Sequence, residues 1–175
     1  PYESRQAKTY LSARLHIRGI PTLVMLGPVV DGDRPLINAY VRSIIETGDY
    51  LSDFPYHPKR YGELNKSSDH INQHRSLIVF FEACDDQEQE DIQEALILAC
   101  ENSTNQHLRF YWSNSAQGLS KVVREVLRLK PVNDKPQMVL LDMLDQGSFY
   151  ISNCTDITLE SILGFLEHPG ERQKV

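Results

Sequence analysis

The feature of this sequence that most constrains its fold is the order of its apolar segments after Ser67. Short runs rich in β-branched and aromatic residues, which favour strands, alternate with stretches whose apolar residues recur at helical spacing. The expected strands are 77–81, 107–112, 137–143 and 149–151, and the expected helices are 85–102, 119–129 and 158–166. Parallel strands need a crossover helix, whereas the last two strands are joined by a tight turn and must be antiparallel. The order β-α-β-α-β-β-α therefore predicts an α/β fold with a mixed central sheet flanked by helices.

The first third of the chain has a shorter version of this pattern. The expected elements are a helix at 5–16 that ends at Gly19, an apolar strand at 22–26, a turn at Asp31-Gly32-Asp33, a second strand at 36–41 and a helix at 44–51. Because the strands are joined by a turn, they should form a β-hairpin. This α-β-β order matches the second half of the larger pattern.

A proline-rich stretch separates the two patterns. Phe54-Pro55-Tyr56-His57-Pro58-Lys59 contains two prolines, each of which removes a backbone donor and opposes regular structure. We therefore predict three parts: residues 1–53, half of one unit; residues 54–66, a linker; and residues 67–175, one complete unit.

Composition excludes several classes of partner. Acidic residues outnumber basic ones, 24 to 18, so a nucleic-acid surface with clustered Lys and Arg is not expected. No run of about 18 apolar residues is present, so we expect no membrane-spanning helix. Cys84, Cys100 and Cys154 are odd in number and form no C-x-x-C pair, which argues against a disulfide framework or a zinc site. We expect reduced thiols in a cytoplasmic and nuclear protein.

Two other patterns bear on ligands and on location. His70 and His74 would share a helical face, but no set of Cys, Asp or Glu completes a metal site around them, so we expect no metal and no cofactor. Asparagine acceptor patterns for glycosylation occur at Asn65, Asn102 and Asn153. These three patterns leave open the alternative that the protein is secreted.

Residues 17–26, Ile-Arg-Gly-Ile-Pro-Thr-Leu-Val-Met-Leu, resemble the cis-proline segment of the thioredoxin family, in which G-I-P-T-L precedes a core strand. X-Pro is the peptide bond that adopts cis at modest cost. By resemblance, a cis bond here turns the preceding backbone groups toward the catalytic cysteines, where they pair with a peptide like an added strand. The resemblance implies that Ile20 and Pro21 are joined by a cis bond and bind substrate. The alternative is a turn that merely starts a strand.

The stretch from Phe54 to Lys59 is similar to an F-P-W-H-P-K segment in the nucleoredoxin and tryparedoxin branch of that family, with Tyr56 in place of the usual Trp. Leu140-Leu141-Asp142-Met143 is similar to the C-terminal domain of the same branch. The turn at 27–35 departs from the family by being longer and richer in proline. The resemblance covers essentially the whole chain and implies a thioredoxin-like fold.

The family's W-C-P-P-C-R dithiol is expected upstream of Pro1. Exchange needs a low-pKa thiolate backed by a resolving cysteine, and this chain has no such pair. We therefore expect no catalytic residue in it, and whether it is an enzyme stays open.

Two residues of the complete unit are further candidates. Cys84 follows the 77–81 strand, close to where a thioredoxin has its first cysteine, and is a candidate monothiol. The carboxylates of Glu82, Asp85 and Asp86 disfavour its thiolate. Pro136 precedes the 137–143 strand, at the position of a second cis-proline.

Three functions follow as hypotheses. The first is the C-terminal part of a nucleoredoxin-like protein-disulfide oxidoreductase that acts in redox-dependent regulation and signalling, on partner proteins with regulatory thiols or disulfides. The second is a non-catalytic thioredoxin-like interaction module. The third is a secreted relative of disulfide isomerases. The hairpin of the first segment would also leave an exposed strand edge, which invites dimerisation.

Overall fold

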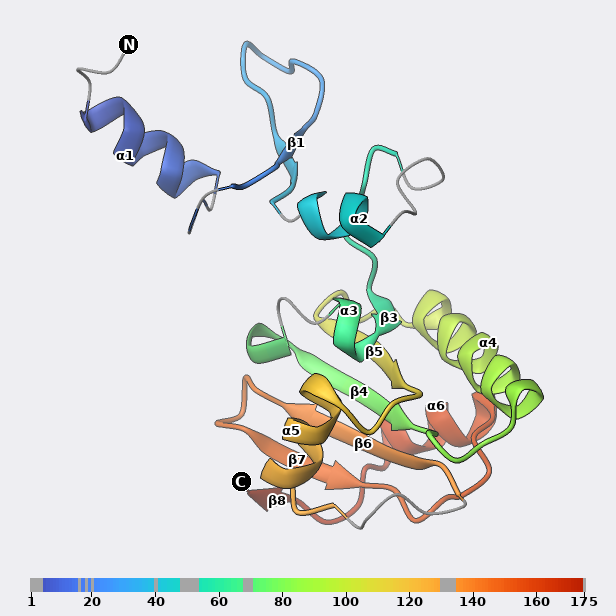
Figure 1. The fold of residues 1–175 in the computed structure, drawn as a ribbon. Helices are drawn as coiled ribbons and strands as arrows, with labels where there is room; N and C mark the ends of the chain where they lie inside the picture. Colours follow the sequence, from blue (N-terminus) through green and yellow to red (C-terminus); the bar gives the residue numbers. More distant parts are fainter. Residues whose placement is uncertain are drawn as a thin grey trace. The chain divides into compact units, whose positions relative to one another are not determined.

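The computed structural model describes residues 5–15, 17, 19, 21–39, 41–47, 54–67, 71–129 and 135–174. The chain divides into two compact units, Pro1–Lys59 and Arg60–Val175 (Figure 1).

The second unit is built on a six-stranded mixed sheet in the order β3-β5-β4-β6-β7-β8. Its strands are β3 (Tyr61–Glu63), β4 (Arg75–Phe80), β5 (Leu108–Ser113), β6 (Gln137–Asp142), β7 (Ser148–Ile151) and β8 (Gln173–Lys174). β5 runs parallel to both β3 and β4, whereas β6, β7 and β8 each run antiparallel to the strand before them in the sheet. The mixed sheet predicted from the order of segments is confirmed.

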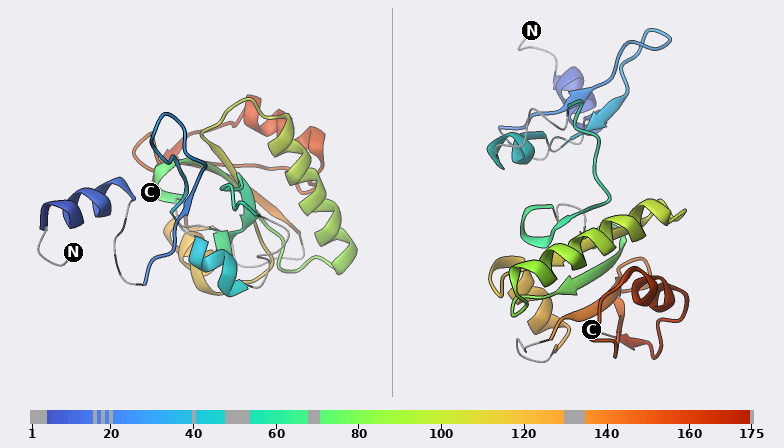
Figure 2. Two further views of the ribbon diagram at one scale, coloured as in Figure 1. Left: turned by 90° about the horizontal axis from the view of Figure 1, so that it is seen from above. Right: turned by 90° about the vertical axis from the view of Figure 1, so that its right-hand side faces the viewer.

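Helices cover both faces of this sheet (Figures 1 and 2). They are α3 (Leu64–Ser67) and α5 (Gly118–Val126) on one face, and α4 (Asp86–Asn102) and α6 (Leu159–Glu167) on the other. Successive side chains of a strand point to opposite faces, so Leu77 and Val79 of β4 pack under α4 and α6, while Ile78 and Phe80 pack under α3 and α5. This is the thioredoxin-like arrangement expected from the sequence.

The structure corrects the end of the linker. Residues 60–66 were predicted to belong to it, but they form β3 and most of α3 in the second unit. Residues 61–63 pair with Phe110, Tyr111 and Trp112 of β5, and Leu64 is fully buried. The sequence Tyr-Gly-Glu carries no strand signal because its pairing with β5, rather than its own propensity, forms the strand.

Arg60 anchors the start of this unit to the end of α4. Its guanidinium donates to the carbonyl oxygens of Cys100, Ser103 and Asn105, the last two at 3.2 and 3.1 Å. Its own carbonyl accepts from the backbone N–H of Phe110 at 2.8 Å. The last turn of α4 has no basic residue, so Arg60 supplies from outside the helix the positive charge that the C-terminal carbonyls favour.

The first unit contains α1 (Arg5–Arg14), a hairpin of β1 (Met25–Leu26) and β2 (Leu36–Asn38), and α2 (Val41–Thr47). β1 and β2 are antiparallel, so the predicted hairpin is confirmed. Its strands are shorter than expected because the pairing becomes irregular at Met25 and Leu26 and the chain then enters a turn bordered by Pro28 and Pro35. Within that turn Asp33 forms an ion pair with Arg14.

The first unit has two segments in which a cis-proline bond is expected or observed, one at Pro21 and one at Pro55. Ile20 lies outside the described residues, so the cis bond expected between Ile20 and Pro21 stays a prediction. The bond between Phe54 and Pro55 is cis. Beside it, the buried side-chain amide of Asn38 donates to the carbonyl oxygen of Tyr56 at 2.8 Å.

We predict that the fragment 60–175 folds cooperatively and that removal of residues 60–66 from it strongly lowers its free energy of unfolding. The shorter fragment lacks the β3–β5 pairing, the buried side chain of Leu64 and the Arg60 contacts. In the fragment 60–175, Leu64→Ala should cost about 2–5 kcal/mol in urea unfolding. The matched control, Leu98→Ala on the outer face of α4, should change stability by about 0.5 kcal/mol or less, because Leu98 is 39% exposed. Equal stability of the two fragments would contradict this domain boundary.

Candidate functional site

The loop between β4 and α4 is where the thioredoxin resemblance places a dithiol, and here it reads Phe-Glu-Ala-Cys-Asp at residues 81–85. Asp85 is the N-cap of α4, and its carboxylate accepts from the backbone N–H of Glu88 at 2.9 Å. In a redox-active protein the helix N-terminus lowers the pKa of an attacking thiol. Here that end of the helix is occupied by a carboxylate instead.

The environment of Cys84 opposes thiolate formation. The residue is 7% exposed. Burial, and to a lesser extent the carboxylates of Glu88, Asp85 and Glu82, raise the pKa of its thiol to about 11. A thiol with this pKa is deprotonated in about one molecule in ten thousand at neutral pH. The surroundings of Cys84 are therefore those of an inert thiol, and nothing in them supports the candidate monothiol.

Glu82, which precedes this cysteine by two residues, is held in a buried ion pair. The guanidinium of Arg124 on α5 donates from Nη2 to Glu82 Oε2 at 2.7 Å and from Nε to Oε1 at 3.1 Å. The two side chains are 11% and 6% exposed for Arg124 and Glu82. Arg124 also donates to the side-chain oxygen of Gln137 at 3.3 Å and lies over the ring of Phe80, 4.4 Å from its centroid. The pair thus fixes α5 to the ends of β4 and β6.

The sequence does not reveal this pair. Lys121, Arg124 and Arg128 are spaced like the solvated polar face of an ordinary amphipathic helix. Glu82 and Arg124 are 42 residues apart, and no local signal joins them.

Pro136 lies where the resemblance placed it, directly before β6. The first residue of β6, Gln137, pairs with Phe80, the last residue of β4. Among the described residues, however, the cis peptide bond is the one between Phe54 and Pro55, and the bond between Lys135 and Pro136 is not cis. The prediction of a second cis-proline at Pro136 is therefore wrong. Trans is the lower-energy form of an X-Pro bond, and the β4–β6 ladder starts only after Pro136, at Gln137.

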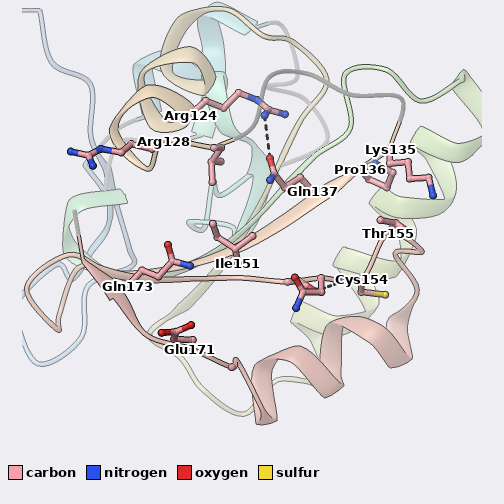
Figure 3. Close-up of a pocket in the computed structure, with 14 residues that line it drawn as sticks. Arg124, Arg128, Lys135, Pro136, Gln137, Ile151, Cys154, Thr155, Glu171 and Gln173 are labelled. Carbon is pink, nitrogen blue, oxygen red and sulfur yellow. Dashed lines mark hydrogen bonds between the residues drawn. The ribbon is translucent and has the colours of Figure 1, made fainter.

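A cavity of about 570 Å³ lies beside Pro136 (Figure 3). It is lined by the end of α5, the start of β6, the end of β7 and the segment that leads into β8. A second cavity of about 270 Å³ borders the same end of β7 from the side of α6. Cys154 lines both, and its thiol donates to the carbonyl oxygen of Asp156 at 3.1 Å.

The remaining candidates are not brought together in one site. All three cysteines are free, and Cys100 is buried on α4, where burial raises the pKa of its thiol. Of the residues that the structure describes, no three His, Cys, Asp or Glu side chains group as metal ligands; His70 lies outside them. Within the same residues, no helix is both long enough and apolar enough to span a membrane.

The three asparagine acceptor patterns differ in their surroundings. Asn102 and Asn153 are exposed. The side-chain oxygen of Asn65 accepts from the backbone N–H of Ser120 at 3.3 Å, in the first turn of α5. The same oxygen would lie 2.8 Å from a Cβ at Gly118, whose φ is +58°, so this helix start is closely fitted around Asn65.

A similarity to one known protein agrees with the sequence resemblance. No family model matches the sequence. The chain is similar to human nucleoredoxin, with 25% identity over 174 residues that cover 95% of this chain. The chain spans 38% of the length of that protein. A solved structure, the crystal structure of the bb fragment of ERp72, covers 91% of this chain and 71% of its own, with 11% identity and a TM-score of 0.41. The predicted resemblance to nucleoredoxin is confirmed.

We predict that one thiol of the native chain reacts rapidly with Ellman's reagent at neutral pH and that the other two react only after unfolding. The reactive thiol should be Cys154, which is half-buried beside two cavities, whereas Cys84 and Cys100 are buried. Cys154→Ser should abolish the rapid phase, and Cys84→Ser should leave it unchanged. A rapid phase that persists in Cys154→Ser and disappears in Cys84→Ser would reverse the assignment.

We also predict that Glu82→Gln lowers the free energy of unfolding by about 3 kcal/mol or more, because it removes the negative charge that Glu82 places against the buried guanidinium of Arg124. The double variant Glu82→Leu/Arg124→Met should recover most of that loss, since it removes both buried charges. Lys121→Met on the exposed side of the same helix is the control and should be close to neutral. If Glu82→Gln proves as mild as the control, the pair does not hold α5 in place.

Proposed function

We propose that this chain is the partner-binding part of a nucleoredoxin-like protein-disulfide oxidoreductase that acts in redox-dependent regulation of partner proteins. The similarity to human nucleoredoxin supports membership of a thioredoxin-like redox group. The observation that carries the rest is the loop at 81–85. It has one buried cysteine with a raised pKa, a carboxylate on the helix N-terminus and a glutamate locked to Arg124.

This loop supports a division of labour in the proposed protein. Thiol exchange needs an exposed thiolate and a second sulfur within reach, and the loop at 81–85 supplies neither. In our proposal, an upstream dithiol performs the exchange. Ile20 and Pro21 supply backbone contacts to the disulfide-bearing segment, and the second unit binds the partner protein.

We further propose that the partners carry regulatory thiols or disulfides and that the protein acts in the cytoplasm and nucleus. Three free cysteines support a reducing environment. A second candidate, a thioredoxin-like module that binds partners without any redox chemistry, is favoured by the same loop. The two differ in whether the natural, longer protein reduces disulfides.

We predict that this chain with dithiothreitol reduces insulin disulfides no faster than its cysteine-free variant, Cys84→Ser/Cys100→Ser/Cys154→Ser. The reason is the lack of a C-x-x-C pair together with the protonated state of Cys84. The natural protein with its upstream sequence should exceed this background if it is the oxidoreductase proposed, and should not if it is only an interaction module. A rate in this chain that is lost in Cys84→Ser would show that Cys84 is a nucleophile and would refute the proposed division.

A further inference from the structure

The outer edge of β7 is covered over only part of its length. β6 pairs with all four residues of β7, from Ser148 to Ile151. On the opposite edge β8 pairs with two residues, Ser148 and Phe149. The β7–β8 ladder therefore stops before Ile151.

The backbone of Ile151 faces this uncovered edge. The N–H of Ser152 donates to the carbonyl oxygen of Met138 at 2.9 Å, so Ser152 faces β6. Backbone groups of adjacent strand residues point to opposite edges, and the N–H and C=O of Ile151 consequently point away from β6. They continue the row that Phe149, two residues earlier, presents to Gln173 of β8. Such a row is a template for a further strand.

Space lies on both sides of this edge. The residues 151–154 line the larger cavity toward α5 and the smaller one toward α6. Gly170, on the segment that leads into β8, also lines both cavities. The gap between the end of β7 and this segment is thus open from both faces of the sheet.

The charges around the larger cavity favour an acidic ligand. Arg128 and Lys135 lie at opposite ends of it, with Ile151 and Gln137 between them (Figure 3). Neither cation has an ion pair within the part of the chain that the structure describes, whereas the charge of Arg124 is neutralised by Glu82. One carboxylate, that of Glu171, also lines the cavity, so the two cations outnumber it. This excess of positive charge occurs in a chain whose formal net charge is −6.

We propose that an extended acidic segment of a partner protein binds here as an added strand. It pairs with the outward backbone groups of Ile151, continues the line of β8 along β7, and places carboxylates near Arg128 and Lys135. Main-chain hydrogen bonds would supply affinity and the two cations would supply selectivity. This inference rests on the proposed partner-binding function and names a site for it that is separate from Ile20 and Pro21.

The test is a titration of the full chain, labelled with ¹⁵N, with a short synthetic peptide in which Glu alternates with Val. The expected result is that backbone amide shifts centre on residues 151–153 and that a Lys-for-Glu peptide binds about tenfold more weakly. The double variant Arg128→Glu/Lys135→Glu should bind the Glu peptide about tenfold more weakly than the unchanged chain does. Lys121→Glu, a charge reversal on α5 outside the lining of the cavity, should leave affinity unchanged. Ile151→Pro removes the outward-facing N–H without removing a hydrogen bond between β6 and β7, and it should abolish binding. Ile151→Val keeps that N–H and should retain binding.

Several results would overturn the proposal. They are no binding at millimolar peptide, equal affinity for the Glu and Lys peptides, amide shifts centred away from β7, or wild-type affinity in the Arg128→Glu/Lys135→Glu variant. Self-association of the chain through this edge without peptide would also overturn it. The charge-reversal variant keeps the test decisive if Ile151→Pro fails to fold. If the peptide does not bind at β7 but partner proteins still bind elsewhere on the chain, the proposed function stands. Insulin reduction by the chain alone would refute the proposed function, whatever the result with the peptide.

Discussion

The second unit depends on the burial of β4 on both of its faces. Every residue from Ser76 to Phe80 has an exposed fraction of 0%. A strand of this kind must be paired on both edges and covered by helices on both faces. β5 and β6 provide the pairing, and the helices on the two faces provide the cover. The crossover through α4 and the antiparallel return through β6 follow from that requirement.

The same burial governs the chemistry at the end of β4. The core does not stop at Phe80 but continues through Phe81 and into Cys84, so the loop is drawn inward instead of being presented to solvent. Glu82 cannot be buried alone, and Arg124 compensates its charge from α5. Asp85 then caps the helix. The loop after β4 is therefore a packed corner in which the charge of Glu82 is compensated.

The sequence predicted those parts of the fold that local pattern determines. The short continuous apolar run at 77–81 identifies β4 as a buried strand, and the apolar residues at helical spacing within 85–102 identify α4. The features it missed depend on contacts between distant residues. Tyr61–Glu63 becomes a strand only beside β5, Arg60 acts on the end of a helix about forty residues away, and Arg124 is recognisable as a buried partner only once Glu82 is placed beside it. The isomer of the Lys135–Pro136 bond likewise could not be read from fold analogy, because the same position in a sheet tolerates either form.

The central proposal is that a mixed sheet between two helical layers is combined with a loop after β4 that does not take part in thiol exchange. The most direct measurement is the ¹³Cβ chemical shift of Cys84 in the full chain, followed by NMR as the pH is raised. The account predicts that the shift keeps its thiol value through the neutral range and changes only toward a midpoint near 11. A midpoint below about 8, the range of activated cysteines, would contradict it.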